Sequence, residues 1–154
     1  MLEAGGAEYC PLQHSAERPV PITSGRVSVH ETPILYSVDL SGCTALTSLH
    51  TDEIVAAFVS ALERAGATVV GSLAHGFPGA GLTCVLVLKE SHAVIHTWPE
   101  TGTVNIDIFS CSTRLRSLEA IEALRGFLCA GSISIQEISR ADGHAGIEHR
   151  LARA

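Results

Sequence analysis

Three consecutive strand-like segments joined by short turns constrain the fold of this chain more than any other feature. Residues 82–88 are almost entirely apolar, residues 91–98 mix β-branched and polar residues, and residues 103–109 alternate between apolar and polar positions. Alternation with a period of two is typical of a strand that buries one face. Strands joined by turns this short pair antiparallel. The sequence therefore predicts an antiparallel sheet built around these segments.

Two helices are expected to cover this sheet. The first is predicted to be capped by Thr51 and to end near Gly66, because apolar side chains recur between them at helical spacing. The second is predicted over about 117–129, with Gly131 ending it. Further strands are expected at 33–40, 67–73 and 133–138. The order β-α-β-β-β-β-α-β indicates an α+β two-layer sandwich, a mainly antiparallel sheet with two helices packed on one face, which leaves the other face for a site or a partner.

The composition predicts a single globular domain that binds neither nucleic acid nor membrane. Of the 154 residues, 46% are hydrophobic and 17% charged, and the net charge is −6. No cluster of Lys and Arg marks a nucleic-acid surface, and no apolar run reaches the roughly 18–20 residues of a membrane-spanning helix. We expect a flexible N-terminal extension at 1–30, a domain at 31–140 and a C-terminal tail at 141–154.

The cysteines and the start of the chain bear on its location in the cell. Five cysteines, an odd number with no CxxC pair, favour reduced thiols over a disulfide framework. The first residues lack the basic and apolar regions of a secretory signal. Together these features predict a cytoplasmic protein.

Residues 90–100 carry too many polar side chains for an ordinary buried strand. Taken singly, these side chains allow several readings. His92 and His96 could bind zinc together with Cys111, although a fourth ligand is not obvious. Ser91 could be a hydrolase serine, but it lacks the G-x-S-x-G elbow. Cys111 could be a thiol nucleophile. Taken residue by residue, a purely structural role is favoured over each of these readings.

Taken together, the run Glu90–Glu100 and the Asp-x-Phe-x-Cys strand at 107–111 are far more specific. They resemble the prokaryotic S-adenosylmethionine decarboxylase proenzymes, which are pyruvoyl-dependent enzymes of polyamine synthesis. The resemblance spans roughly residues 33–138. It also includes Asp39-Leu40, Gly42-Cys43, Gly66-Ala67-Thr68 and the His75-x-Phe77 loop.

The resemblance implies that the proenzyme cuts itself between Glu90 and Ser91. The Ser91 hydroxyl attacks the Glu90 carbonyl, and elimination from the resulting ester converts Ser91 into a pyruvoyl group. That group would form the Schiff base with the substrate amine and act as electron sink in place of pyridoxal phosphate, with no metal. By the same resemblance, His96 is the base for the elimination, and Thr83 assists processing where many relatives have serine.

The resemblance also assigns the substrate residues and the partner. Cys111 matches the cysteine that returns a proton to the substrate carbon. Phe77 matches the aromatic that stacks on adenine, Glu100 matches the carboxylate that binds the ribose hydroxyls, and Trp98 is expected to bind substrate beside them. The product would be the aminopropyl donor for spermidine synthesis. The expected partners are a small-molecule substrate and a second copy of the chain, in a homodimer of processed αβ units.

Three departures from the family pattern leave the substrate open. The usual Gly-x-His-Leu run before the first strand is replaced by residues 33–36, Gly76 stands where arginine is common, and Thr103 stands where tyrosine is common. None of these touches Ser91 or His96. The alternatives are a pyruvoyl-dependent arginine or ornithine decarboxylase of the same family, or a non-processing ligand-binding relative.

Overall fold

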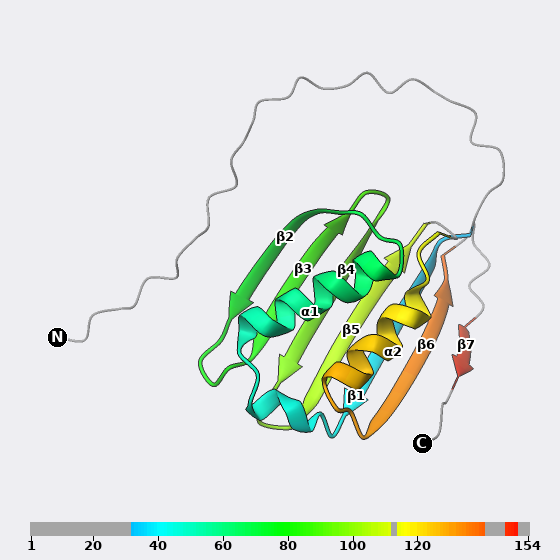
Figure 1. Cartoon of the computed structure of the whole chain (residues 1–154). Helices are drawn as coiled ribbons and strands as arrows, with labels where there is room; N and C mark the ends of the chain where they lie inside the picture. Colours follow the sequence, from blue (N-terminus) through cyan, green and yellow to red (C-terminus); the bar gives the residue numbers. More distant parts are fainter. Residues whose placement is uncertain (1–31, 112–113, 141–146, 151–154) are drawn as a thin grey trace, which may run out of the picture.

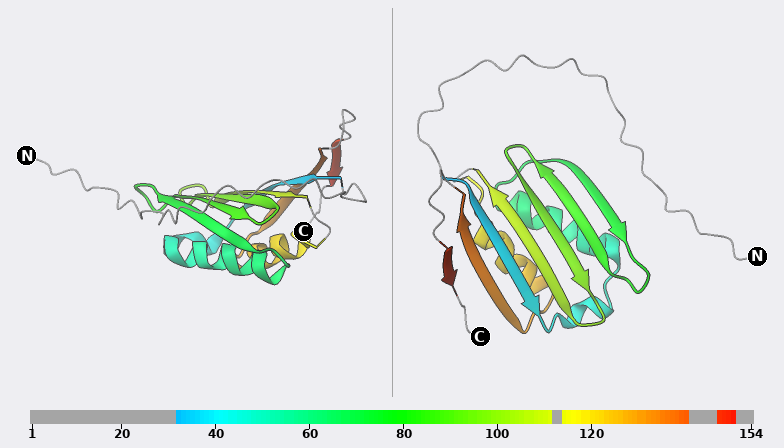
Figure 2. Two further views of the ribbon diagram at one scale, coloured as in Figure 1. Left: turned by 90° about the horizontal axis from the view of Figure 1, so that it is seen from above. Right: turned by 180° about the vertical axis from the view of Figure 1, so that it is seen from behind.

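The computed structural model describes residues 32–111, 114–140 and 147–150. The expected N-terminal extension at 1–30 and most of the expected tail at 141–154 therefore lie outside the described residues. The described part forms one sheet with two helices on a single face, as the edge-on view in Figure 2 shows. The predicted α+β two-layer sandwich is confirmed.

The sheet is antiparallel at every pairing. Its strand order is β2-β3-β4-β5-β1-β6-β7, so that β4, β5 and β1 form its centre (Figure 1). The strands are β1 (Ile34–Ser41), β2 (Val69–Gly76), β3 (Leu82–Leu88), β4 (Ser91–Trp98), β5 (Thr103–Ser110), β6 (Ser132–Ser139) and β7 (Ile147–Arg150). The last of these lies within the expected tail and pairs with β6. Strand β2 continues to Gly76, beyond the predicted end at residue 73, because it stays paired with β3 as far as Leu82.

The helices are α1 (Thr51–Arg64) and α2 (Ser117–Phe127), with a short 3₁₀ helix η1 (Thr44–Thr47) before α1. The prediction that Thr51 caps α1 is wrong by one residue. The cap is His50, whose backbone is extended and whose N–H donates to the Glu53 carboxylate at 2.8 Å. Gly66, with φ of +100°, ends α1 as predicted.

The second helix ends two residues earlier than predicted. Its C-cap is Leu128, and Cys129, two residues before the predicted stop at Gly131, takes the left-handed conformation with φ of +50°. A non-glycine residue can occupy this region at a small cost in free energy.

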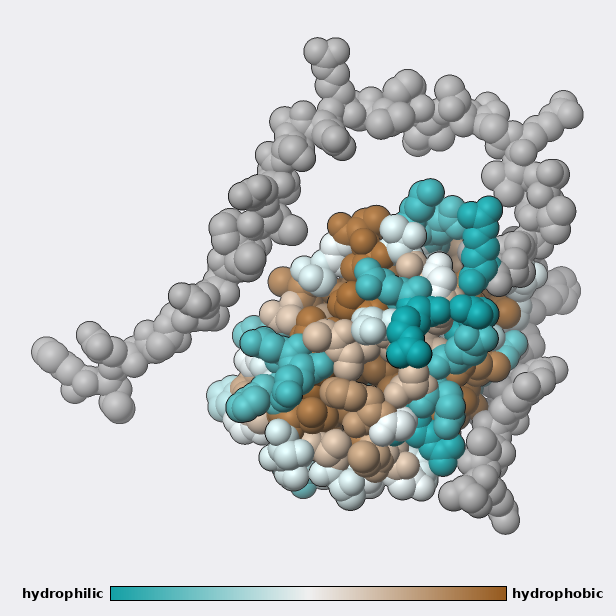
Figure 3. Space-filling view, in the orientation of Figure 1, coloured by the Kyte–Doolittle hydropathy of each residue, from teal (hydrophilic) through white to brown (hydrophobic). Residues whose placement is uncertain are grey.

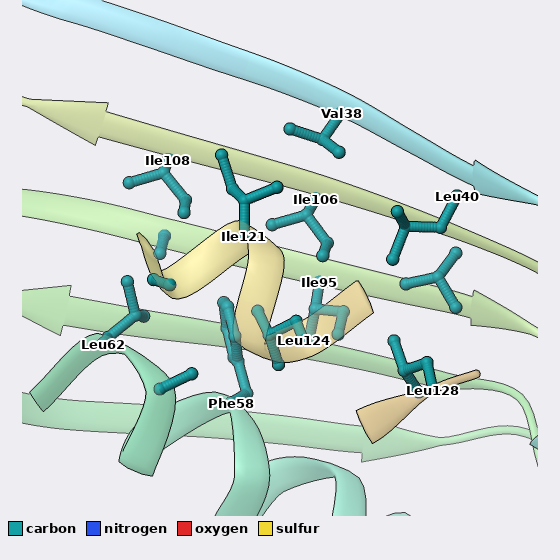
Figure 4. Close-up of a cluster of buried hydrophobic side chains, with 14 of the residues drawn as sticks. Val38, Leu40, Phe58, Leu62, Ile95, Ile106, Ile108, Ile121, Leu124 and Leu128 are labelled. Atoms are coloured by element: carbon teal, nitrogen blue, oxygen red, sulfur yellow. The ribbon is translucent and has the colours of Figure 1, made fainter. Parts of the chain in front are cut away.

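The core lies between the helices and the inward-facing residues of the central strands. Phe58 and Leu62 from α1 and Ile121 and Leu124 from α2 point toward the sheet (Figure 4). The inward residues of β4 and β5 are buried, and they are Ala93, Ile95, Thr97, Val104, Ile106 and Ile108. The alternation predicted for both strands is therefore confirmed.

Few of the side chains on the outer side of the helix layer are of a kind suited to catalysis. Hydrophobic colours gather over the middle of this face (Figure 3), where a groove between α1 and α2 is lined largely by small side chains such as Ala56, Ala57 and Ala123. In the described part of the chain, neither helix is long and apolar enough to cross a membrane.

The helices leave one face of the sheet uncovered, and this face is called here the open face. It is turned toward the viewer in the right-hand view of Figure 2. Strand register places directly opposed residues in rows across it. One row is polar throughout and consists of His75, Thr83, His96, Asn105, Asp39 and Ser134. Toward the β2 edge, the open face also carries an apolar strip made of Leu73, Val85, Val87 and Val94. Leu73 is 66% exposed and Val87 51%, so this strip has no cover within the described part of the chain.

Candidate active site

Ser91 is the first residue of β4 and directly follows the two-residue turn Lys89–Glu90. Its hydroxyl oxygen accepts a hydrogen bond from the backbone N–H of Cys111 at 3.2 Å. This bond ties the start of β4 to the residue just beyond the end of β5. The two predicted residues Ser91 and Cys111 are therefore neighbours, and the serine oxygen is held in one place.

A small cavity of about 100 Å³ lies beside the Glu90–Ser91 peptide bond. Its lining combines the turn and both flanking strand ends with the segment after α1, and includes Gly66, Thr68, Lys89, Glu90, Ser91 and Arg114. The turn is anchored by the Lys89 N–H, which donates to the Thr68 carbonyl at 2.9 Å. The bond predicted to break thus sits in a tethered turn with space next to it.

The segment after Cys111 is fastened to the end of α1. The Arg116 backbone N–H donates to the Ala65 carbonyl, and the Arg116 guanidinium donates to the Arg64 carbonyl, both at 2.9 Å. A Cβ atom on Gly66 would lie 2.7 Å from the Arg114 carbonyl oxygen, so only glycine permits this approach. The end of α1 therefore helps to set the position of the chain that follows Cys111.

The other predicted residues surround a second, larger cavity at the opposite end of β4. This cavity has a volume of about 550 Å³, and its lining includes Phe77, Thr83, His96, Trp98 and Glu100. The two aromatic rings are each 49% exposed, and Glu100 is exposed as well. A volume in this range, with apolar walls and a few polar groups, is typical of a site for a small molecule.

Two side chains that line this cavity, Thr83 and His96, are directly opposed on β3 and β4 and bond to each other. The Thr83 hydroxyl lies 2.7 Å from the Nδ1 atom of His96. Because one ring nitrogen is engaged by this hydroxyl, the ring is oriented with its Nε2 atom left for another partner. The loop wall is fixed too, since the ring of Phe77 packs edge-on against that of His75 at 4.7 Å.

The predicted residues thus fall into two groups separated by the length of one strand. Figure 1 shows the β3–β4 turn at the top of the sheet, and the β2–β3 loop and β4–β5 turn at the bottom. Ser91 and Cys111 belong to the first end, and Phe77, Thr83, His96, Trp98 and Glu100 belong to the second. A single chain does not bring the two groups together.

Sequence reasoning missed two residues beside the larger cavity, Asn105 and Asp39. The indole N–H of Trp98 donates to Asn105 Oδ1 at 2.9 Å, and the Asn105 amide donates to Asp39 Oδ1 at 2.7 Å. The signal available in the sequence was the polar position of Asn105 in an alternating strand. That signal predicts a face of the sheet and does not predict which side chains meet there.

The alternative zinc set of His92, His96 and Cys111 is not assembled in the structure. The His92 ring stacks on Phe109 with centroids 5.1 Å apart. Within the ranges that the structure describes, no group of three or more His, Cys, Asp or Glu side chains is placed to hold a metal ion.

Two other cysteines are part of the core. Cys43 and Cys84 are buried, and burial raises the pKa of both thiols above the ordinary value of 9.0, with nearby Cys129 adding to the effect on Cys43. A thiol that resists ionisation is a poor nucleophile. The described cysteine best placed for chemistry is therefore Cys111, which touches Ser91.

Comparisons with known proteins identify the family and the fold of this chain. The sequence model described as S-adenosylmethionine decarboxylase matches residues 35–141. The S-adenosylmethionine decarboxylase proenzyme of Acidithiobacillus ferrooxidans is 32% identical over 102 residues, which cover 66% of this chain and 77% of that protein. The proenzyme of Methanococcus vannielii is 38% identical over 94 residues, covering 61% of this chain and 75% of that protein. The crystal structure of the adenosylmethionine decarboxylase from Aquifex aeolicus has the same fold, with a TM-score of 0.65 at 23% identity, covering 77% of this chain and 99% of that one.

Proposed function

Because this chain belongs to the S-adenosylmethionine decarboxylase family, we propose that it is a self-processing decarboxylase of S-adenosylmethionine, which supplies the aminopropyl donor for spermidine synthesis. The observation that carries the proposal is the position of Ser91. Its hydroxyl is held by the Cys111 N–H next to the Glu90 peptide bond, in a turn with a cavity beside it. A serine hydroxyl aligned against the preceding carbonyl is what self-cleavage requires.

Maturation uses the chain's own atoms. The Ser91 oxygen attacks the Glu90 carbonyl carbon, the Ser91 nitrogen is released from the amide, and an ester forms. Removal of the Ser91 α-proton then expels the Glu90 carboxylate and leaves a dehydroalanine, which water converts to a pyruvoyl group with loss of ammonia. The two products are residues 1–90 and 91–154. The cavity beside the bond gives the separated ends room to part.

The residues around Ser91 fit the pyruvoyl group that would arise there. When formed, this group supplies a carbonyl that accepts electrons from the breaking carbon–carboxylate bond. The Ser91 oxygen leaves with the Glu90 carboxylate, so the Cys111 backbone N–H that now donates to it would be left beside the new group as a hydrogen-bond donor. The Cys111 thiol follows on the same residue and is the proton donor that we assign to the substrate carbon.

The larger cavity supports the adenosyl substrate. Phe77 and Trp98 offer aromatic faces suited to a flat base, and the exposed Glu100 carboxylate can accept hydrogen bonds from ribose hydroxyls. Glu100 could equally attract a cationic side chain, so arginine and ornithine remain the alternative substrates. The volume of about 550 Å³ suits a nucleoside better than a single amino-acid side chain.

We further propose that the active unit is a homodimer. The separation between Ser91 and the larger cavity within one chain supports it, because a two-fold axis would place the Ser91 end of one sheet against the cavity end of its partner. The apolar strip on the open face supports a face-to-face contact, since burying it removes exposed Leu73 and Val87 from water. Cytoplasmic location is supported by free thiols at Cys43, Cys84, Cys111 and Cys129.

The test of the proposal is self-cleavage. Purified wild-type protein should show two fragments on a denaturing gel, with intact masses of residues 1–90 and 91–154, the second blocked at its amino terminus. Ser91→Ala should leave one full-length, inactive chain, whereas the control Ser72→Ala, at an exposed position on β2, should be cut normally. An uncut wild-type chain would favour the non-processing ligand-binding relative.

The substrate is tested by release of CO₂ from labelled S-adenosylmethionine, arginine and ornithine. We expect turnover with S-adenosylmethionine. If CO₂ were released only from arginine or ornithine, that amino acid would replace S-adenosylmethionine as the proposed substrate, and the pyruvoyl mechanism would still stand. The Cys111→Ala variant should still be cut but lose decarboxylation by roughly a hundredfold or more, because it lacks the proton donor.

A further inference from the structure

The hydrogen-bonded chain beside the larger cavity includes two residues, Asn105 and Asp39, that have no role in the function proposed above. It starts at the Trp98 indole on β4, passes through the Asn105 amide on β5 and ends at the Asp39 carboxylate on β1. The two bonds are 2.9 Å and 2.7 Å long, and Asp39 and Asn105 are directly opposed in the strand register. Three strands therefore contribute to holding one ring.

The order of the three side chains leaves only one arrangement of the central amide. An indole N–H is solely a donor and an ionised carboxylate is solely an acceptor. An amide between them must turn its oxygen to Trp98 and its nitrogen to Asp39. Asp39 thereby fixes the orientation of Asn105, and Asn105 fixes the position of the indole N–H.

The held ring is a wall of the cavity, whereas the two residues that hold it are not. Trp98 is among the residues that line the cavity, and Asn105 and Asp39 lie outside that lining. A tryptophan side chain that is 49% exposed would otherwise be free to sample several rotamers. The opposite polar group of the cavity is held in a similar manner, because His96 is bonded to Thr83.

We propose that Asn105 and Asp39 are positioning residues that hold the Trp98 indole in place, so that the cavity is preorganised for a flat aromatic base. A wall that is already ordered loses less conformational entropy when the ligand binds. The identity of that ligand, a nucleoside sulfonium, rests on the proposed function. The positioning itself concerns only the ring and can be tested without any activity.

Trp98 is the only tryptophan of the chain, so its indole N–H gives a single resonance in a ¹⁵N–¹H spectrum. Asn105→Ala should shift this resonance and speed its exchange with solvent. Asp39→Ala should shift it less than Asn105→Ala does, and Asp39→Asn, which keeps an acceptor oxygen, should restore the wild-type position. The matched control is Gln136→Ala, which removes an amide from the open face of β6. An indole signal unchanged in Asn105→Ala would overturn the proposal.

Loss of the hydrogen bond between Trp98 and Asn105 should affect KM and kcat differently. Loss of the bond should raise KM for S-adenosylmethionine about fivefold while leaving kcat at saturation near the wild-type value. A shifted indole signal with an unchanged KM in an active enzyme would also refute preorganisation. Failure of the proposed function looks different, because the wild-type chain would then be uncut and inactive while the indole signal still responded to Asn105→Ala.

Discussion

Ser91 and His96 lie five residues apart on β4, so their α-carbons are separated by about 16 Å along an extended strand. Alternation also directs their side chains to opposite faces of the sheet. Within one chain, the imidazole therefore cannot remove a proton from residue 91. The role in processing that the sequence resemblance implies for His96 requires the imidazole to come from a second chain.

Mixed dimers test this requirement. Ser91→Ala and His96→Ala chains should each stay uncut when produced alone. When the two are co-expressed with different tags, the His96→Ala chain should be cut, because its Ser91 meets the intact His96 of the other chain. The Ser91→Ala chain should remain full length. A denaturing gel with tag-specific detection measures both results, and an uncut mixture would contradict a site shared between two copies.

The bond between Thr83 and His96 should affect the rate of maturation. Thr83→Val keeps the shape of the side chain but removes the hydroxyl that lies 2.7 Å from Nδ1, so the ring loses its orientation. We expect self-cleavage to slow by about five- to tenfold, which corresponds to one hydrogen bond. Thr83→Ser keeps the hydroxyl and should be cut at close to the wild-type rate. Equal cleavage rates in the two variants, followed by gel over time, would remove Thr83 from the processing step.

Gly66 should be intolerant of any side chain. Gly66→Ala forces a φ of +100° on alanine and places its Cβ 2.7 Å from the Arg114 carbonyl oxygen. The free energy of unfolding should fall by about 1–3 kcal/mol, measured by urea denaturation of the uncut Ser91→Ala chain. The matched control is Gly126→Ala inside α2, where no atom lies within 4 Å of the new Cβ. That variant should be stabilised by roughly 0.5–1 kcal/mol, since alanine favours a helix. Equal losses at the two sites would contradict the close approach at Gly66.

The buried thiols predict a loss of stability in alkaline solution. Burial raises the pKa of the Cys84 thiol above 9.0 in the folded chain. The stability that the protonated Cys84 thiol contributes is fully present below pH 9, where the thiol is protonated in both the folded and the unfolded chain. As the pH rises further, the unfolded chain releases this proton first, so the free energy of unfolding falls until the folded thiol also ionises.

Urea denaturation at pH 8 and pH 10 measures this effect. The Cys84→Ala variant should be less stable at both values because of the cavity it leaves, but its stability should fall less between them. If the wild-type protein and the variant lost the same amount of stability between pH 8 and pH 10, the Cys84 thiol would not be the cause of the loss.

Several features of the fold could be read from local sequence because they depend on neighbours in the chain. The alternation of β4 and β5 predicted which residues are buried, and the glycine at 66 predicted the end of α1. The cap of α1 was misplaced by one residue, because the extended backbone of His50 has no signature in its side chain. Cys129 in a left-handed conformation was missed for a similar reason, since such positions favour glycine.

By itself, the sequence determined the family of this protein and predicted its chemistry, because the Glu90–Glu100 run and Cys111 are patterns of residue types that can be read directly from the chain. Only the tertiary structure decided where that chemistry lies. It separated Ser91 from the larger cavity by the length of β4, and it brought Asp39 to Asn105, 66 residues away, through the pairing of β1 with β5. A period of two fixes the face on which a side chain lies. Strand order and register fix its neighbours, and they depend on long-range pairing and core packing that no local pattern contains.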